Sequence, residues 1–102
     1  MSELIMERTN SDEGAKFKII GRITNANENH FEKKLNDALE MGFNHIVLNM
    51  QDVTLMTSIG IRIILKTYKS CVGAGGKFQI EDPSEVVKNV LGLSALQQMM
   101  VE

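Results

Sequence analysis

Residues 46–65 read Ile46-Val47-Leu48-Asn49-Met50-Gln51-Asp52-Val53-Thr54-Leu55-Met56-Thr57-Ser58-Ile59-Gly60-Ile61-Arg62-Ile63-Ile64-Leu65, and this stretch decides the fold. Its first three residues are apolar, so they would present apolar side chains on both faces of a strand. Such a strand is typical of the centre of a sheet that carries helices. A helix is expected between it and the preceding strand, which favours parallel pairing and a right-handed crossover.

The second half of this stretch predicts a helix that begins near Ser58. Apolar residues at helical spacing predict its inward face, which consists of Ile61, Ile64, Leu65, Tyr68 and Val72. Basic residues are expected to face outward, namely Arg62, Lys66 and Lys69. The glycine-rich run at residues 73–76 is expected to end the helix and to form a turn into the next strand.

Two edge-like strands are expected at the start of the chain. Leu4 and Met6 alternate with polar neighbours, and residues 9–14 form a turn-rich break. Residues 17–23 then alternate between apolar and mostly basic side chains, which is the period of a half-buried strand.

A first helix is predicted between the second strand and residue 46. Asn25 is the expected N-cap, with Glu28 completing a pair similar to a capping box. An apolar stripe defines its inward face, and the stripe consists of Phe31, Leu35, Ala38 and Leu39. Gly42 stands where a left-handed C-cap residue is needed.

The C-terminal third predicts a fourth strand, a third helix and a short tail. Residues 77–81 alternate, and Asp82-Pro83-Ser84-Glu85 predicts a helix start with Asp as N-cap and Pro at the first helical position. Residues 94–102 are expected to hold a short helix and a terminal strand around residues 99–101. This order predicts an α/β fold in which helices pack on a mostly central, parallel sheet of four to five strands.

Length and composition exclude several classes of protein. A chain of 102 residues is expected to form one domain over residues 1–102. Its net charge of -2 argues against nucleic-acid binding, which needs a basic face. Cys71 cannot form an internal disulfide, and no apolar run approaches the roughly 20 residues that span a bilayer. We therefore expect a cytoplasmic protein without membrane insertion, and a monomer because no heptad seam is present.

No catalytic or metal-ligating set is evident in the sequence. His30 and His45 lack metal-ligand spacing to each other or to Cys71, so we expect no metal and no cofactor. Residues 73–76 follow a helix and lack the pattern of a phosphate-binding loop, which favours a helix-to-strand turn. The sequence therefore indicates a protein that is not an enzyme.

Two hydroxyl residues, Thr57 and Ser58, stand where the second helix is expected to begin. Loops beyond the carboxyl ends of strands are the usual location of sites in open α/β sheets. Most hydroxyls at a helix start are simple N-caps. A phosphate esterified to one of them would place close to two negative charges at the positive end of the helix dipole.

The same residues carry a family resemblance. Residues 46–53, followed by Met56-Thr57-Ser58-Ile59-Gly60-Ile61-Arg62-Ile63-Ile64-Leu65, resemble the STAS domain, and more narrowly the bacterial anti-sigma factor antagonists of the SpoIIAA type. Gly73-Ala74-Gly75-Gly76-Lys77-Phe78 resembles their glycine turn before the fourth strand. Residues 86–93 resemble their following short helix. In element order, the resemblance covers nearly the whole chain.

The resemblance implies a protein switch in a partner-switching pathway. The unphosphorylated form would bind an anti-sigma factor serine kinase, and phosphorylation would release it. A PP2C-type phosphatase would then reset the switch. By position, the phosphoacceptor is Ser58, with Thr57 as second choice. The implied partner surface combines the loop before the first helix, the loop before the second helix and the exposed face of that helix: Thr24, Asn25, Ala26, Asn27, Met56, Thr57, Ser58, Ile59, Gly60, Arg62, Ile63 and Lys66.

The chain departs from the family pattern at three positions. Thr57 and Thr24 stand where carboxylates are usual, and Ile59 replaces a second small hydroxyl residue. These departures leave two other functions open. One is a STAS module that is not phosphorylated and serves as an accessory subunit of a transporter or a scaffold of a signalling complex. The other is a binder of a small phosphate ligand at the same helix start.

Overall fold

The structure is a computed structural model that describes residues 4–12, 14–93 and 100–101. Strands and helices alternate along most of the chain, in the predicted order. The elements are β1 (Leu4–Ser11), β2 (Gly14–Ile23), α1 (Glu28–Glu40), β3 (His45–Met56), α2 (Ser58–Gly73), β4 (Lys77–Glu81), α3 (Glu85–Leu93) and β5 (Met100–Val101). The terminal strand is thus confirmed for residues 100 and 101, whereas the short helix expected after residue 93 falls outside the described residues.

Within the described residues, five strands form one mixed sheet in the order β1-β2-β3-β4-β5. The β1–β2 pair is antiparallel, and the other three pairs are parallel. The expected parallel sheet with β3 at its centre is therefore confirmed. Only β1 of the first two strands lies at an edge, because β2 pairs with β3 on its other side; the expectation that both are edge-like is wrong for β2.

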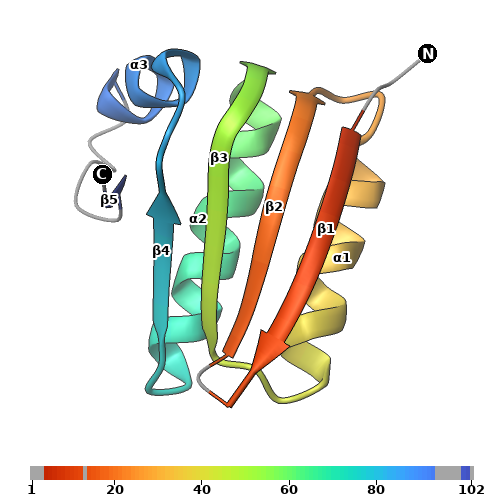
Figure 1. Ribbon diagram of the computed structural model, residues 1–102, viewed down its shortest axis with the longest axis vertical. Helices are drawn as coiled ribbons and strands as arrows, with labels where there is room; N and C mark the ends of the chain where they lie inside the picture. Colours follow the sequence, from red (N-terminus) through yellow and green to blue (C-terminus); the bar gives the residue numbers. More distant parts are fainter. Residues whose placement is uncertain (1–3, 13, 94–99, 102) are drawn as a thin grey trace.

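Helices α1 and α2 lie behind the sheet in Figure 1, side by side, while α3 lies beyond the carboxyl end of β4. The burial of residues at the start of β3 reflects the position of the two helices on one face of the sheet. Ile46, Leu48 and Met50 are fully buried, whereas Val47 between them is only half-buried. The expectation that residues 46–48 are covered equally on both faces is therefore wrong, because α1 and α2 cover the same face.

The ends of α1 and α2 share one geometry. Gly42 has a φ of 94° and donates to the carbonyl of Leu39, and Phe43 donates to that of Ala38. This is a Schellman motif, and it confirms Gly42 as the left-handed residue after α1. The segment 73–76 forms the same motif after α2, with Gly75 at a φ of 80°. That segment is a helix-to-strand turn, as predicted.

The inward face of α2 differs from the prediction. Its buried residues are Gly60, Ile63, Ile64, Thr67 and Cys71. Val72, predicted to face inward, is 50% exposed. Apolar residues surround this helix over residues 59–65, so periodicity alone does not define the inward face. Gly60 contributes to the choice of face, because without a Cβ atom it can lie close to the buried side chains of Met56 and Ile23.

The start of α3 also differs from the prediction. Asp82 is not the N-cap: it has a φ of 48°, and the helix begins at Glu85. Ser84 takes the capping role, because its hydroxyl accepts a hydrogen bond of 3.3 Å from the backbone N–H of Val87. Ser84 also donates its own N–H to the carbonyl of Met50, which attaches this turn to β3.

Candidate functional site at the carboxyl ends of β2 and β3

Two predicted site segments start from neighbouring strand ends. Ile23 and Met56 are register partners at the ends of the parallel strands β2 and β3. The next residue, Thr57, donates its backbone N–H to the carbonyl of Ile23 at 3.1 Å. The loop at residues 24–27 and the first turn of α2 therefore begin side by side, as the resemblance implied.

Asn27 fixes the shape of the loop before α1. Its side chain is almost fully buried, at 5% exposure, and donates from Nδ2 to the carbonyl of Arg22 at 2.7 Å. Its Oδ1 accepts from the backbone N–H of Thr24 at 3.0 Å. Asn25 is not the N-cap, because that position belongs to Asn27 and α1 begins at Glu28. The loop is thus held from inside by one amide.

The first turn of α2 separates the two hydroxyl residues. Thr57 is the N-cap, but its Oγ1 is buried and has no hydrogen-bond partner among the described residues. Ser58 is the first helical residue and its side chain is exposed. The carbonyl of Thr57 accepts from the N–H groups of Gly60 and Ile61. Of the two hydroxyls, only that of Ser58 is open to a modifying enzyme.

Gly60 lets this turn pack against the strand ends. A Cβ atom at this position would lie 2.6 Å from Met56 Cγ and 3.0 Å from Ile23 Cγ2. Both side chains are buried, so neither has free space. The glycine two residues after Ser58 therefore sets how closely the start of α2 approaches β2 and β3.

Two ion pairs join the exposed edges of α1 and α2. Arg62 Nη2 lies 3.1 Å from Glu28 Oε2, and Lys66 Nζ lies 2.8 Å from Glu32 Oε2. Each pair joins residues separated by 34 positions, so the two helices run alongside each other in one register. Neither glutamate is among the predicted site residues, although their spacing of four residues matches that of the two cations.

The twelve predicted site residues fall into three groups by exposure. The exposed ones are Asn25, Ala26, Ser58, Arg62 and Lys66. The half-buried ones are Thr24, Thr57 and Ile59. The buried ones are Asn27, Met56, Gly60 and Ile63. The placement of Ile63 on an exposed face is wrong, because its side chain is fully buried against the sheet; the residue that follows Arg62 on the exposed row is Lys66.

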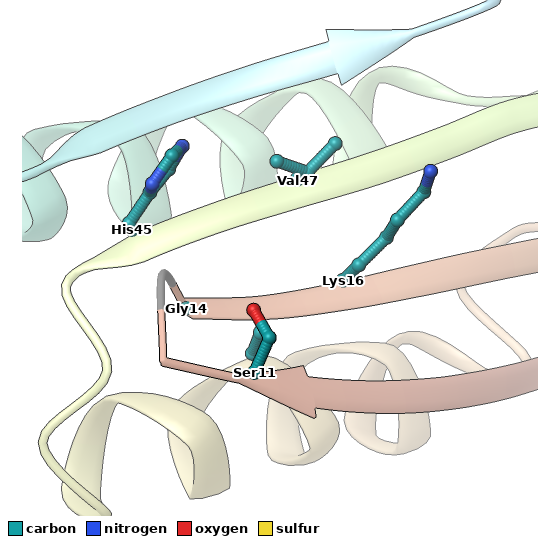
Figure 2. A pocket seen from close by; sticks show the side chains of 6 residues that line it. Ser11, Gly14, Lys16, His45 and Val47 are labelled. Carbon is teal, nitrogen blue, oxygen red and sulfur yellow. The ribbon is translucent and has the colours of Figure 1, made fainter.

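A small pocket of about 130 Å³ lies at the opposite end of the sheet. Figure 2 shows the side chains of Ser11, Lys16, His45 and Val47 around it, on three adjacent strands. Lys16 Nζ is paired with Glu81 at 2.8 Å, and His45 Nε2 is buried without a partner among the described residues. This pocket lies at the amino ends of β2 and β3, so it is separate from the segments around Ser58.

The described residues hold no group of three or more His, Cys, Asp or Glu side chains arranged to bind a metal ion. In the same part of the chain, every helix is too short or too polar to span a bilayer.

Comparisons with known proteins assign the family. The STAS domain family model matches residues 5–101. The chain belongs to the STAS domain family. A candidate anti-sigma factor antagonist of Thermotoga maritima is 33% identical to this STAS chain over 73 residues, or 70% of this chain and 65% of that protein. This STAS chain thus spans about two thirds of the length of that relative.

Solved structures show the same STAS fold. A crystal structure of a candidate anti-sigma factor antagonist from Thermotoga maritima superposes with a TM-score of 0.85 at 27% identity, over 93% of this chain and 82% of that one. The anti-sigma factor antagonist SpoIIAA in its unphosphorylated form gives a TM-score of 0.84 at 19% identity, over 97% and 86%. SpoIIAA of Bacillus in its phosphorylated form gives 0.78, also at 19% identity, over 97% and 89%.

Proposed function

We propose that this STAS chain is an anti-sigma factor antagonist that works by partner switching. The unphosphorylated chain binds an anti-sigma factor serine kinase in the cytoplasm, as a monomer. The kinase transfers the γ-phosphoryl group of ATP to Ser58 Oγ, which releases ADP and a proton, and the complex separates. A PP2C-type phosphatase hydrolyses the ester with water and returns the serine and inorganic phosphate. The chain itself performs no catalysis.

One observation carries this proposal: Ser58 is exposed as the first residue of α2, while the neighbouring Thr57 hydroxyl is buried. A kinase can reach the serine without unfolding the helix. The favoured acceptor is therefore Ser58, and Thr57 would need the start of α2 to open.

The start of α2 can accommodate a phosphate on Ser58, whereas a partner packed over Ser58 cannot. A dianion at a helix N-terminus is stabilising, typically by about 0.3–1 kcal/mol at exposed positions. A partner packed over Ser58 would instead have to desolvate that dianion, at a cost of several kcal/mol. A micromolar complex is held by only about 8 kcal/mol. Phosphorylation can therefore dissociate the complex while the fold persists.

The partner surface consists of the exposed residues around Ser58. The first part is the tip of the loop before α1, formed by Asn25 and Ala26, and the second is the row on α2 formed by Ser58, Arg62 and Lys66. Asn27 and Gly60 lie beneath this surface and hold its shape through the contacts described above.

Incubation with ATP and each anti-sigma-type serine kinase of the same genome tests the proposal. We expect a mass gain of one phosphate group on the peptide that contains Ser58, and none in Ser58→Ala. Ser70→Ala is the matched control, because Ser70 is an exposed serine on the same helix, near its other end. Phosphate on another residue, or tight kinase binding by Ser58→Asp, would contradict the proposal.

The substitution of Thr57 and Thr24 for the usual carboxylates favours a second candidate, a STAS scaffold or transporter accessory subunit that is never phosphorylated. Stable partner binding without any mass gain would support it.

The third candidate, a binder of a small phosphate ligand, predicts that nucleotides shift the amide resonances of residues 56–61. The switch predicts no such shifts.

A further inference from the structure

The exposed row on α2 places a cation one turn after the proposed phosphoacceptor. Ser58, Arg62 and Lys66 follow each other at intervals of four residues, and all three side chains are exposed. Residues at this spacing are neighbours on a helix surface. Arg62 is therefore one turn from Ser58 along its own helix, and it is paired with Glu28 of α1.

We propose that a phosphate on Ser58 forms an ion pair with Arg62, which then no longer pairs with Glu28. This inference rests on the proposed function, because it concerns the phosphorylated form of the same site. Arg62 acts here as a phosphate-binding residue, and its exchange of partner opens one of the two ion pairs between α1 and α2.

The charges favour this exchange. A phosphoserine carries close to two negative charges and three acceptor oxygens, whereas Glu28 offers a single charge. The guanidinium group can bind a phosphate through two parallel hydrogen bonds. The present Arg62–Glu28 pair opposes this exchange only weakly, because the side chain of Arg62 is 58% exposed and that of Glu28 is 31% exposed. Exposed ion pairs of this kind contribute little to stability.

The surroundings of Ser58 leave Arg62 as the charged group within one turn of it on α2. Thr57, which donates its backbone N–H to Ile23, and Thr24, which follows Ile23, carry no charge. Lys66 lies two turns from Ser58 and is bound to Glu32 at 2.8 Å. The Lys66–Glu32 pair therefore stays closed when the Arg62–Glu28 pair opens. Helices α1 and α2 stay side by side because the buried residues of both pack against the sheet.

The exchange changes both parts of the proposed partner surface. Glu28 is the first residue of α1 and directly follows the loop at residues 24–27. When Arg62 leaves, the carboxylate of Glu28 becomes an unpaired negative charge beside that loop. A single phosphate then adds negative charge at the start of α2 and uncovers negative charge at the start of α1. A partner that packs over both elements would then have to desolvate unpaired negative charge at both.

The test uses protein with phosphoserine installed at position 58 during translation, so no kinase is needed. Phosphorus NMR measures the second pKa of the phosphoserine, which is about 6 when unperturbed. We expect Arg62→Gln to raise this pKa by about half a unit or more, because the stabilising cation is removed. Lys66→Gln is the matched control and should leave the pKa unchanged. Equal pKa values in the unsubstituted protein and in Arg62→Gln would overturn the inference.

A second measurement follows the partner of Arg62 directly. Glu28→Gln should shift the Arg62 Nε–Hε resonance of the unmodified protein and leave it in place in the phosphorylated protein. A shift of equal size in both forms would show that Arg62 stays on Glu28. These outcomes do not depend on any kinase, so failure of the proposed switch and failure of this exchange are separate results.

Discussion

Thr57 donates its backbone N–H to the carbonyl of Ile23 at 3.1 Å, and this hydrogen bond joins the two segments of the site. The residue after Ile23 begins the loop before α1, and the residue after Thr57 is the exposed serine. The contact is therefore the structural reason why two segments separated by more than 30 residues form one surface around Ser58.

Gly60 is the first position that tests this arrangement. Gly60→Ala should destabilise the protein by about 1 kcal/mol, because overpacking against Met56 and Ile23 outweighs the gain in helix propensity. Gly73→Ala, in the last turn of α2 with open space around it, should be neutral or stabilising. Urea unfolding of both variants measures the difference, and equal stabilities would argue against the close contact.

Asn27 should contribute more to the stability of the fold than the nearby Asn25. Asn27→Ala removes the amide that bonds to Arg22 and Thr24, and we expect a loss of about 1–3 kcal/mol in the free energy of unfolding. Asn25→Ala should stay within about 0.5 kcal/mol, because Asn25 is exposed and is not a cap. Thermal unfolding of both variants provides the comparison. A larger loss in Asn25→Ala would restore the sequence-based assignment of the cap.

The sequence predicted the positions of strands and helices better than the details of their ends. Gly42 was predictable because a glycine after an amphipathic helix has one common role. Residue type predicts Asn25 and Asp82 as caps, yet the caps are Asn27 and Ser84. Each place offers more than one cap-forming residue within four positions, and packing selects among them.

The site was predictable in part. Ser58 at the start of α2 followed from the family pattern and from the loop position after a central strand. The sequence places Ile63 wrongly because apolar residues surround α2, so periodicity alone does not identify the buried face. The Arg62–Glu28 and Lys66–Glu32 pairs depend on the register between α1 and α2, which no local pattern encodes.

The buried hydroxyl of Thr57 gives a third prediction. Thr57→Val should be neutral or stabilising by up to about 1 kcal/mol, because an unpaired buried polar group is replaced by a methyl group of similar size. Thr67→Val is the contrasting variant: its hydroxyl is buried and donates to the carbonyl of Ile63 at 2.9 Å, so its removal should destabilise by about 1 kcal/mol. Chemical unfolding of both variants measures the two changes in stability. The reverse order of stabilities would contradict the assignment of the Thr57 hydroxyl as unpaired and the Thr67 hydroxyl as hydrogen-bonded.

Cys71 predicts how stability depends on alkaline pH. Burial raises the pKa of its thiol from 9.0 to about 11. The folded state therefore keeps a proton that the unfolded state loses, and stability falls as the pH rises from about 9 to about 11. The expected loss is about 2 kcal/mol. Cys71→Ala should lack this component, so the difference between the two pH profiles measures it; parallel profiles would contradict the prediction.

The most direct test of the proposed switch compares kinase binding and thermal stability of the chain with and without phosphoserine at position 58. We expect the phosphorylated chain to keep its melting temperature within about 5 °C, because the helix start tolerates the charge. Its affinity for the kinase should fall at least about 100-fold, which corresponds to about 2.7 kcal/mol. Phosphoserine at position 70 should leave the affinity unchanged. Undiminished binding of the kinase by the chain phosphorylated at Ser58, or loss of the folded state, would contradict the account.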